Sequence, residues 1–252
     1  MSRHAVLFGL NYEETPEARL RGCVNDVLNM KDVLQSPEYH FDDVRALTTG
    51  TTTTARNILT EMDNLASRSH VHNLEVAWIH FSGHGCSVTD LTGDERDGKD
   101  ECIVPSDFRR VGVVSDDLIR TILRKFNPKT KVVCIFDCCH SGTIGDLKYR
   151  YISSNTVHTE HTGAPCPAKV MMLSGCSDTQ TSADAYNVNN AYKFSGAMTS
   201  CLITSMKEMG EPDKIKIHEL IVKLRDILKE KQFTQVPQLC ASYFVRNDET
   251  LF

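Results

Sequence analysis

Several features that would place the chain in a special class of protein are missing from its sequence. No apolar run approaches the ~20 residues that are needed to span a bilayer, and no low-complexity tract or long Pro/Gly/Ser linker divides the 252 residues. The apolar start at 5–10 is too short for a secretory signal and is typical of a first strand. We therefore expect one domain over residues 1–252, with no membrane partner.

An excess of basic residues is also missing. The chain has 28 Lys and Arg against 33 Asp and Glu, a formal net charge of -5, whereas nucleic-acid surfaces show clustered Lys and Arg. We therefore expect no nucleic-acid partner. The sequence has no Asn-x-Ser/Thr sequon, and several of its ten cysteines lie inside apolar segments, as Cys134, Cys201 and Cys240 do. Such cysteines behave as small hydrophobic residues, so we expect a cytoplasmic protein rather than a secreted disulfide scaffold. We also expect a monomer.

Strand-like and helix-like segments alternate along the chain. Continuous apolar runs are typical of buried strands in a parallel sheet, and apolar residues at helical spacing mark the segments between them. We expect strands at 5–10, 44–48, 75–81, 131–136, 170–173 and 243–245, and helices at 23–35, 54–68, 115–126, 195–207 and 216–231. The alternation predicts an α/β fold, a sandwich of three layers with helices on both faces of a mostly parallel central sheet.

Two glycine-rich loops follow the two most apolar strands. One is SGHG at 82–85, and the other is DCCHSG at 137–142. Ligands of such sheets bind beyond the carboxyl ends of the strands, so both loops are expected at one edge. A nearby His favours the thiolate form of a Cys and can protonate a leaving amine, and the spacing from His84 to Cys139 is close to the ~50 residues of caspases. The pattern predicts a His/Cys pair for nucleophilic catalysis.

Together these motifs resemble those of a known family, the metacaspases, which are caspase relatives of protists, fungi and plants. The doubled Cys and the short connector look closest to the type I-like metacaspases of kinetoplastids. Further similar segments are the acidic hairpin from 97 to 107, SGCSDTQTSAD at 174–184, GAMT at 196–199 and QVPQL at 235–239. The resemblance implies a caspase-like fold with a large-subunit-like part (1–142), a connector (143–169) and a small-subunit-like part (170–252).

By this resemblance the protein is a cysteine endopeptidase. Cys139 is its nucleophile and His84 its general base and acid, while the N–H groups of Gly85 and Cys139 form the oxyanion hole. The residues alone do not separate Cys138 from Cys139 as the nucleophile.

The same resemblance implies a preference for a basic P1 residue, the residue before the scissile bond. Pocket positions that are basic in caspases look acidic here, at Asp26 and Asp137, and Cys23 and Ser82 would line the same pocket. A carboxylate pair suits the ammonium of Lys or the guanidinium of Arg, which it can bind through two hydrogen bonds. The expected partners are therefore protein or peptide substrates with Arg or Lys. Without the resemblance, Asp26 fits equally well as a helix-start residue favoured by the macrodipole.

Calcium is the expected cofactor, as an activator. The acidic run at 94–101 does not match an EF-hand, because with Gly98 at the sixth position Gly93 and Val104 would stand where the two end ligands belong. A solvated charged hairpin is the ordinary interpretation of such a run. The resemblance instead implies a site from separate loops, with oxygen ligands that suit a hard cation. The implied ligands are Asp100, Asp116, Asp117 and Asp146. Two of these, Asp116 and Asp117, also fit as carboxylates at a helix start.

The polar stretch 143–169 has no periodicity and is typical of a lid, a binding loop or a disordered segment. In a protease it would serve as a cleavable connector, which suggests an autocatalytic zymogen. Basic residues that fit the P1 preference are Lys148, Arg150 and Lys169, with Lys193 in the next loop.

Three alternatives stay open. One is a catalytically silent caspase-fold scaffold, which a covalent active-site label would test. Another is a caspase-type, Asp-specific peptidase, which the absence of a Q-A-C-x-G motif disfavours. The third is a zinc module, disfavoured because its candidate ligands contain no C-x₂-C pair and adjacent cysteines in a strand point apart. Those candidates are His84, Cys86, Cys138, Cys139 and His140.

Overall fold

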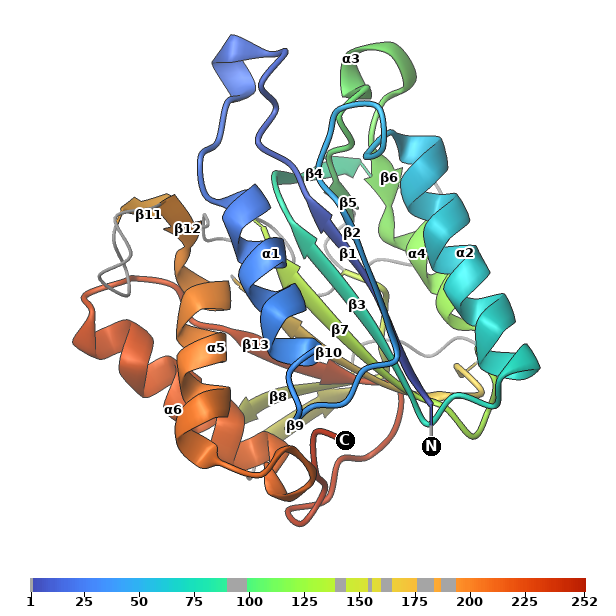
Figure 1. The fold of residues 1–252 in the computed structure, drawn as a ribbon, viewed down its shortest axis with the longest axis vertical. Coiled ribbons are helices and arrows are strands. Elements are labelled where there is room, and N and C mark those ends of the chain that lie inside the picture. Colours follow the sequence, from blue (N-terminus) through green and yellow to red (C-terminus); the bar gives the residue numbers. More distant parts are fainter. Residues whose placement is uncertain are drawn as a thin grey trace.

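The computed structural model describes residues 2–89, 99–138, 144–153, 156–159, 165–175, 184–186 and 194–252. Within them, one eight-stranded sheet forms the centre of the fold (Figure 1). Its strands are, in spatial order, β2 (Asp43–Leu47), β1 (Arg3–Gly9), β3 (Val76–Ser82), β7 (Lys131–Asp137), β10 (Lys169–Ser174), β13 (Gln238–Ala241), β8 (Tyr149–Ser153) and β9 (Thr156–Thr159). The strands from β2 to β10 are parallel, and the remaining pairs are antiparallel. The mostly parallel α/β sheet that the sequence predicts is confirmed.

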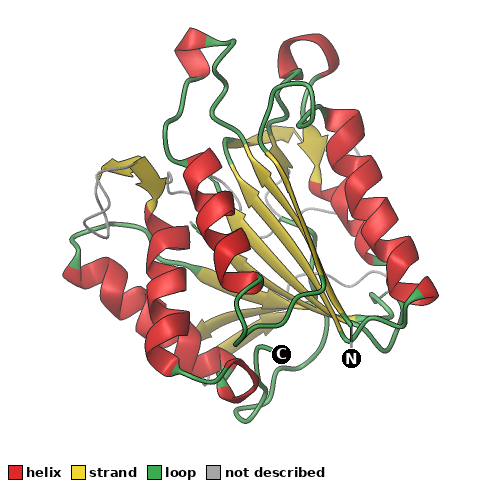
Figure 2. Ribbon diagram, in the orientation of Figure 1, coloured by secondary structure: helices red, strands yellow, loops and turns green. Residues whose placement is uncertain are grey.

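Helices cover both faces of this sheet (Figure 2). One face carries α1 (Cys23–Leu34), α5 (Ala197–Met209) and α6 (Ile217–Glu230), and the other carries α2 (Ala55–Val71) and α4 (Asp116–Leu123). The alternation of side chains along a strand creates the two cores. In β1, Ala5 and Leu7 belong to the first core, whereas Val6 and Phe8 belong to the second. Because apolar residues face both cores, the strands read as unbroken apolar runs.

Smaller elements decorate this sandwich. A three-stranded antiparallel sheet follows the carboxyl end of β3 and contacts α4. It consists of β4 (Gly85–Thr89), β5 (Lys99–Ile103) and β6 (Val114–Ser115). The other short elements are the pair β11 (Asp184–Tyr186) and β12 (Phe194–Gly196), helix α3 (Phe108–Val111), and the 3-10 turns η1 (Pro16–Ala18) and η2 (Pro212–Lys214). In the part of the chain that the structure describes, no helix is long and apolar enough to cross a membrane.

Two expectations about strands are wrong. The last strand is β13 and not 243–245, because Leu239 and Cys240 are buried beside β10 whereas Phe244 is 60% exposed. The stretch 143–169 is not without regular structure either. It contributes β8 and β9 to the edge of the main sheet, since Tyr151 packs into the core opposite Leu239. Segments as short as these carry too few alternating residues for a period to be read.

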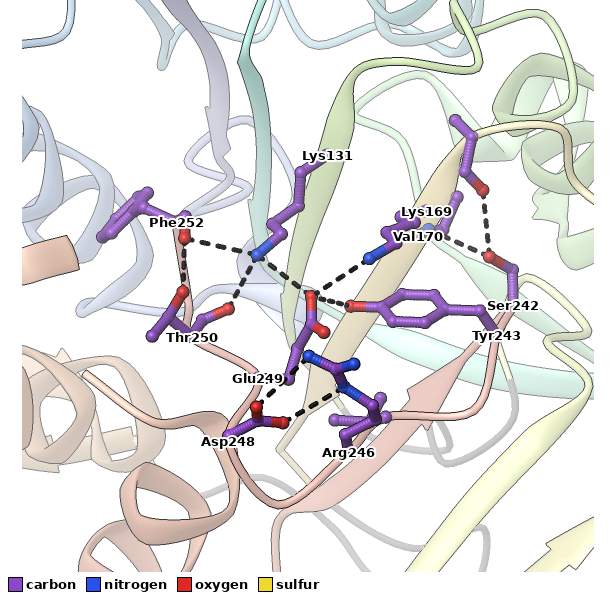
Figure 3. Close-up of polar contacts among 12 residues, drawn as sticks. Lys131, Lys169, Val170, Ser242, Tyr243, Arg246, Asp248, Glu249, Thr250 and Phe252 are labelled. Atoms are coloured by element: carbon purple, nitrogen blue, oxygen red, sulfur yellow. Dashed lines mark hydrogen bonds and ion pairs between the residues drawn. The ribbon is translucent and has the colours of Figure 1, made fainter. Parts of the chain in front are cut away.

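The chain after β13 closes the amino-terminal edge of the sheet (Figure 3). The carboxylate of Glu249 lies 3.2 Å from Nζ of Lys131, at the start of β7, and 3.6 Å from Nζ of Lys169, at the start of β10. The hydroxyl of Tyr243 donates to the same carboxylate at 3.1 Å. These contacts fix β7 and β10 at one end, and their opposite, carboxyl ends lead to the loops of interest.

Candidate active site

The carboxyl ends of β1, β3 and β7 form one row. The parallel register places Gly9 beside Ser82, and Ser82 beside Asp137. Ser82 and Asp137 share the strand parity of Trp78 and Ile135, so both side chains point to the face that α1 and α5 cover. Both are almost fully buried. The row therefore brings together the ends of the two strands that carry the glycine-rich loops.

His84 lies in the loop between β3 and β4, directly after this row, and is partly exposed. Its Nε2 atom is 2.7 Å from the carbonyl oxygen of Ala18. Since a carbonyl oxygen can only accept, Nε2 carries the proton of the neutral ring and Nδ1 keeps its lone pair. Gly83 has no room for a side chain, because a Cβ there would lie 2.9 Å from both the Phe81 ring and the Tyr12 hydroxyl. The hydrogen bond to Ala18 thus holds the imidazole of His84 in one tautomer, with Nδ1 as the basic atom.

The hydroxyl of Tyr12 is inserted into the hydrogen-bond ladder beside His84. The N–H of His84 donates to Tyr12 Oη at 2.9 Å, and the Tyr12 hydroxyl donates to the carbonyl of Val104 at 2.6 Å. The N–H of Val104 donates to the carbonyl of His84 at 3.0 Å. Burial raises the pKa of Tyr12 well above its ordinary value, so its hydroxyl keeps the proton that it donates. Sequence reasoning missed Tyr12, which lies 72 positions before His84 in an irregular loop.

The two predicted pocket carboxylates, Asp26 and Asp137, lie close together beside this row of strand ends. Asp26, in the first turn of α1, is 1% exposed and accepts the Ser82 hydroxyl at 2.6 Å and the Gly196 N–H at 2.6 Å. Asp137 is 3% exposed and accepts the N–H of Thr199 at 2.9 Å and its hydroxyl at 2.8 Å. Ser82 therefore belongs to this cluster, as expected, and Gly196 and Thr199 join it without having been predicted.

Gly196 lies between the two carboxylates. A Cβ at this position would come within 2.6 Å of Oδ2 of Asp26 and closer still to Oδ2 of Asp137. The backbone angles of Gly196, φ -63° and ψ 137°, are open to any residue, so the glycine is required by contact and not by conformation. Gly196 is also the N-cap of α5. Both carboxylates thus face the positive end of a helix, where N–H groups need acceptors.

A fully buried histidine, His80, stands behind Thr199. Its Nε2 atom is 3.2 Å from Thr199 Oγ1, and burial lowers the pKa of His80 to about 3. The ring is therefore neutral, and its Nε2–H can donate to the Thr199 oxygen, whose own proton goes to Asp137. This chain of hydrogen bonds fixes the orientation of Asp137. The GAMT motif contains Gly196 and Thr199, but nothing in its spacing indicates a contact with Asp137, 62 positions away.

Fewer contacts are known for the remaining predicted catalytic and pocket residues. Cys23 is the first residue of α1 and is 7% exposed. Gly85 is the first residue of β4. Cys138 is fully buried in the core beneath α2 and α4, on the face opposite to Asp137. Cys139 lies outside the described residues, as do His140 and Gly142.

The predicted calcium ligands are mostly buried. Asp100 on β5, Asp116 at the start of α4 and Asp146 are each less than 9% exposed, and Asp117 is partly exposed. Asp116 accepts the N–H of Glu101 at 2.7 Å, which joins it to the strand that carries Asp100. These are the hard oxygen donors that calcium prefers. Among the residues that the structure describes, however, no three His, Cys, Asp or Glu side chains are grouped as a metal site.

A cavity of about 880 Å³ opens between α1 and α5. It reaches Asp26 and Thr199 at its inner end and continues to Glu38 and Glu211, and neither His84 nor Asp137 lines it. The cavity therefore lies behind the pocket carboxylates and not beside the loops of the predicted catalytic pair.

Comparison with known proteins reveals a family. The family model described as "Metacaspase, peptidase C14 domain" matches residues 3–148. A protein named Metacaspase-3 from Trypanosoma brucei brucei is 34% identical over 264 residues, which cover 98% of this chain and 72% of that protein. A protein named Metacaspase-1 from Meyerozyma guilliermondii is 33% identical over 295 residues, which cover 96% of this chain and 70% of that protein. The similarity thus extends over nearly the whole chain.

Solved structures resemble the fold. A crystal structure of a protein from Geobacter sulfurreducens superposes with a TM-score of 0.70 at 22% identity, covering 99% of this chain and 98% of that one. A crystal structure of caspase-1 from Spodoptera frugiperda superposes with a TM-score of 0.57 at 12% identity, covering 95% of this chain and 85% of that one. At such identities the likeness concerns the fold, and it confirms the expected caspase-like sandwich.

Proposed function

The chain belongs to the metacaspase family of cysteine peptidases, and we propose that it is a calcium-activated endopeptidase that cleaves after Arg or Lys. In this proposal Cys139 is the nucleophile and His84 the general base and acid. The N–H groups of Gly85 and Cys139 form the oxyanion hole, and Asp26 and Asp137 bind the P1 side chain. The observation that carries the specificity is the pair of buried carboxylates next to the His84 loop.

The contacts of the two carboxylates support a cationic P1 residue. Ser82, Gly196 and Thr199 are neutral donors, which orient the carboxylates without cancelling their charges. A guanidinium or an ammonium is the kind of group that hydrogen-bonds strongly to carboxylates. An acidic P1 side chain would instead be repelled by two negative charges, which argues against the caspase-type preference for Asp.

The geometry of His84 supports a defined route for the proton. With Nε2–H directed to Ala18, Nδ1 takes the proton of the Cys139 thiol. The thiolate attacks the carbonyl carbon of the scissile bond, and the tetrahedral intermediate collapses as the proton moves to the leaving amine. Water then attacks the acyl-enzyme, losing a proton to Nδ1 that returns to the thiol. The full burial of Cys138 disfavours it as the nucleophile.

The position of Gly85 suits an oxyanion donor. His84 and Val104 are joined by a hydrogen bond at the start of the β4–β5 ladder, and hydrogen-bonded and non-hydrogen-bonded pairs alternate in antiparallel strands. Gly85 and Ile103, the next pair, are therefore non-hydrogen-bonded. The N–H of Gly85 is directed away from β5, as the stabilisation of a substrate oxyanion requires.

Calcium is proposed as a switch, bound by Asp100, Asp116, Asp117 and Asp146. Burying a carboxylate without a cation is costly because of desolvation, and a divalent cation would offset that cost. Asp116→Ala should therefore raise the free calcium concentration for half-maximal activity, while Asp63→Ala, at a partly exposed residue of α2, serves as a control. Full activity of the unchanged protein in excess chelator would refute the switch. An unchanged calcium midpoint in Asp116→Ala would refute the ligand assignment.

Self-cleavage is proposed at Lys148, which is exposed, or at Lys193, which lies outside the described residues. Arg150 and Lys169 are less suited, because they belong to strands β8 and β10 of the main sheet. Mass spectrometry of calcium-treated protein would locate the new chain ends. An intact chain with full activity would mean that processing is not required.

A panel of fluorogenic peptides that differ only at P1 tests the proposed function, with and without calcium. We expect turnover after Arg and Lys and none after Asp. Efficient cleavage after Asp would overturn the proposed specificity. Failure of a covalent active-site probe to label the protein, together with no turnover, would favour a silent scaffold.

A further inference from the structure

The hairpin of β4 and β5 carries two cysteines that take no part in the proposed catalysis. The register places Cys86 directly opposite Cys102. Because His84 and Val104 are joined by a hydrogen bond two positions earlier, Cys86 and Cys102 also form a hydrogen-bonded pair. The Cα atoms of such a pair are ~5.5 Å apart, and disulfides most often join Cα atoms ~5.5–6 Å apart. Directly opposed side chains also lie on one face of the sheet, so a disulfide would need only a small approach of the two strands.

The two thiols differ in their access to solvent. Cys86 is partly exposed, whereas Cys102 is fully buried. A hydrogen bond from the Cys102 thiol lowers the pKa of Cys86, while burial raises the pKa of Cys166, another partly exposed cysteine. An accessible, more acidic thiol beside a buried one is the arrangement of a reactive cysteine with its resolving partner.

We propose that Cys86 and Cys102 form a modification site at which a peroxide produces a cross-strand disulfide. Hydrogen peroxide reacts first at Cys86: the sulfur bonds to one oxygen, the O–O bond breaks and hydroxide leaves, which gives a sulfenic acid. The Cys102 sulfur then attacks the Cys86 sulfur. The S–S bond forms as the S–O bond breaks, and the hydroxyl departs as water with the Cys102 proton. The two sulfurs together lose two electrons, and the peroxide is reduced to water.

The disulfide would join β4 to β5 close to Gly85, the first residue of β4. It would close the loop 87–101, and a crosslink of this kind stabilises mainly by restricting the unfolded chain. Oxidised protein should therefore have a higher Tm, which dithiothreitol reverses. The inference rests on the hairpin alone and does not depend on the proposed peptidase activity.

The test uses the full chain with Cys139→Ala in every arm, so that the proposed nucleophile does not compete for oxidant. The protein is treated with hydrogen peroxide, its remaining thiols are alkylated, and its digest is analysed by tandem mass spectrometry. We expect a linked peptide pair that contains Cys86 and Cys102, together with a rise in Tm. Both effects should vanish in Cys86→Ser and persist in Cys166→Ser, the matched control.

Three results would overturn the proposal. They are alkylation of both cysteines after peroxide treatment, linkage of Cys86 to another cysteine, and conversion of Cys86 to sulfinic acid without a link. The peptide map of the Cys139→Ala protein decides between these results even where a second substitution impairs folding.

Discussion

Replacing Gly196 with alanine would place a methyl group between the two pocket carboxylates. The backbone angles at this position accept alanine, with φ at -63°, so the start of α5 should form as before. The change therefore acts mainly on the carboxylates, with a smaller cost at the helix start because alanine is a poorer N-cap residue than glycine. Gly196→Ala thus tests whether the geometry of Asp26 and Asp137 sets the specificity for a basic P1 residue.

The expected effect follows from the space available. The new Cβ would lie within 2.6 Å of an oxygen of each carboxylate, whereas ordinary contacts begin at 3.4 Å. One carboxylate must then move by roughly 1 Å, and a misplacement of that size in a binding site can cost about 100-fold in rate. We therefore expect kcat/KM for Arg and Lys substrates to fall about 100-fold, which corresponds to about 2.7 kcal/mol of transition-state stabilisation. Overpacking costs about 1–3 kcal/mol of stability, which a domain with about 5–15 kcal/mol tolerates.

The assay compares kcat/KM with the rate of alkylation of the catalytic thiol by iodoacetamide. Gly196→Ala should lose peptidase activity but keep its alkylation rate, because the thiol does not depend on the P1 pocket. Gly50→Ala is the control, since its Cβ would meet nothing closer than 3.6 Å, at the Glu14 side chain. Unchanged kcat/KM in folded Gly196→Ala would refute the pocket assignment. Equal losses of peptidase activity and thiol alkylation would instead indicate a general disturbance of the site.

Three further predictions concern positioning, catalysis and stability. Thr199→Val should raise KM for Arg substrates, because it removes the hydroxyl that orients the carboxylate of Asp137. Thr199→Ser keeps a hydroxyl and should restore KM. Equal KM values for the two variants would contradict this role. Cys139→Ala should abolish turnover while Cys138→Ala keeps most of it, and the reverse result would exchange the two roles. Burial alone would raise the pKa of Glu249, but Lys131 and the other partners of its carboxylate lower it, and the net effect is a lower pKa. Its contribution to stability is therefore present above the ordinary glutamate pKa of 4.5 and is lost as the pH falls through the lower pKa of the folded state. Thermal melts should accordingly show a deficit in Tm for Glu249→Gln at neutral pH that disappears in acid, and a deficit independent of pH would contradict the assignment.

Long apolar runs made the parallel core of the fold predictable. Strands β3 and β7 are buried along both faces, so their sequences are continuously apolar and their ends could be placed within one residue. The antiparallel edge was not predictable in the same way. β13 has four residues and follows Pro237, and it becomes a strand because β10 and β8 lie on either side of it. Such a strand depends on tertiary pairing more than on its own composition.

The predicted site shows the same division between local and long-range information. Asp137 and His84 follow directly from strands, and the resemblance of motifs indicated Asp26. Gly196 and Thr199 come from a segment far along the chain, and their contacts depend on how α5 packs beside α1. A period or a spacing within one segment cannot reveal a contact of that kind.

The amino end of α5 links the proposed specificity to the placement of one helix. Two buried carboxylates side by side repel each other, and the N–H groups and dipole of the helix start offset part of that repulsion before a substrate is bound. A basic P1 side chain would bring a positive charge to the two carboxylates, whereas an acidic one would add a third negative charge. A displacement of α5 would move Gly196 and Thr199 together, and with them the donors of both carboxylates. Ser82 and Asp137 tie the pocket to the strand ends that carry His84 and Cys139, whereas Gly196 and Thr199 belong to another segment, so substitutions at these two should affect the selection of substrate more than the proposed chemistry.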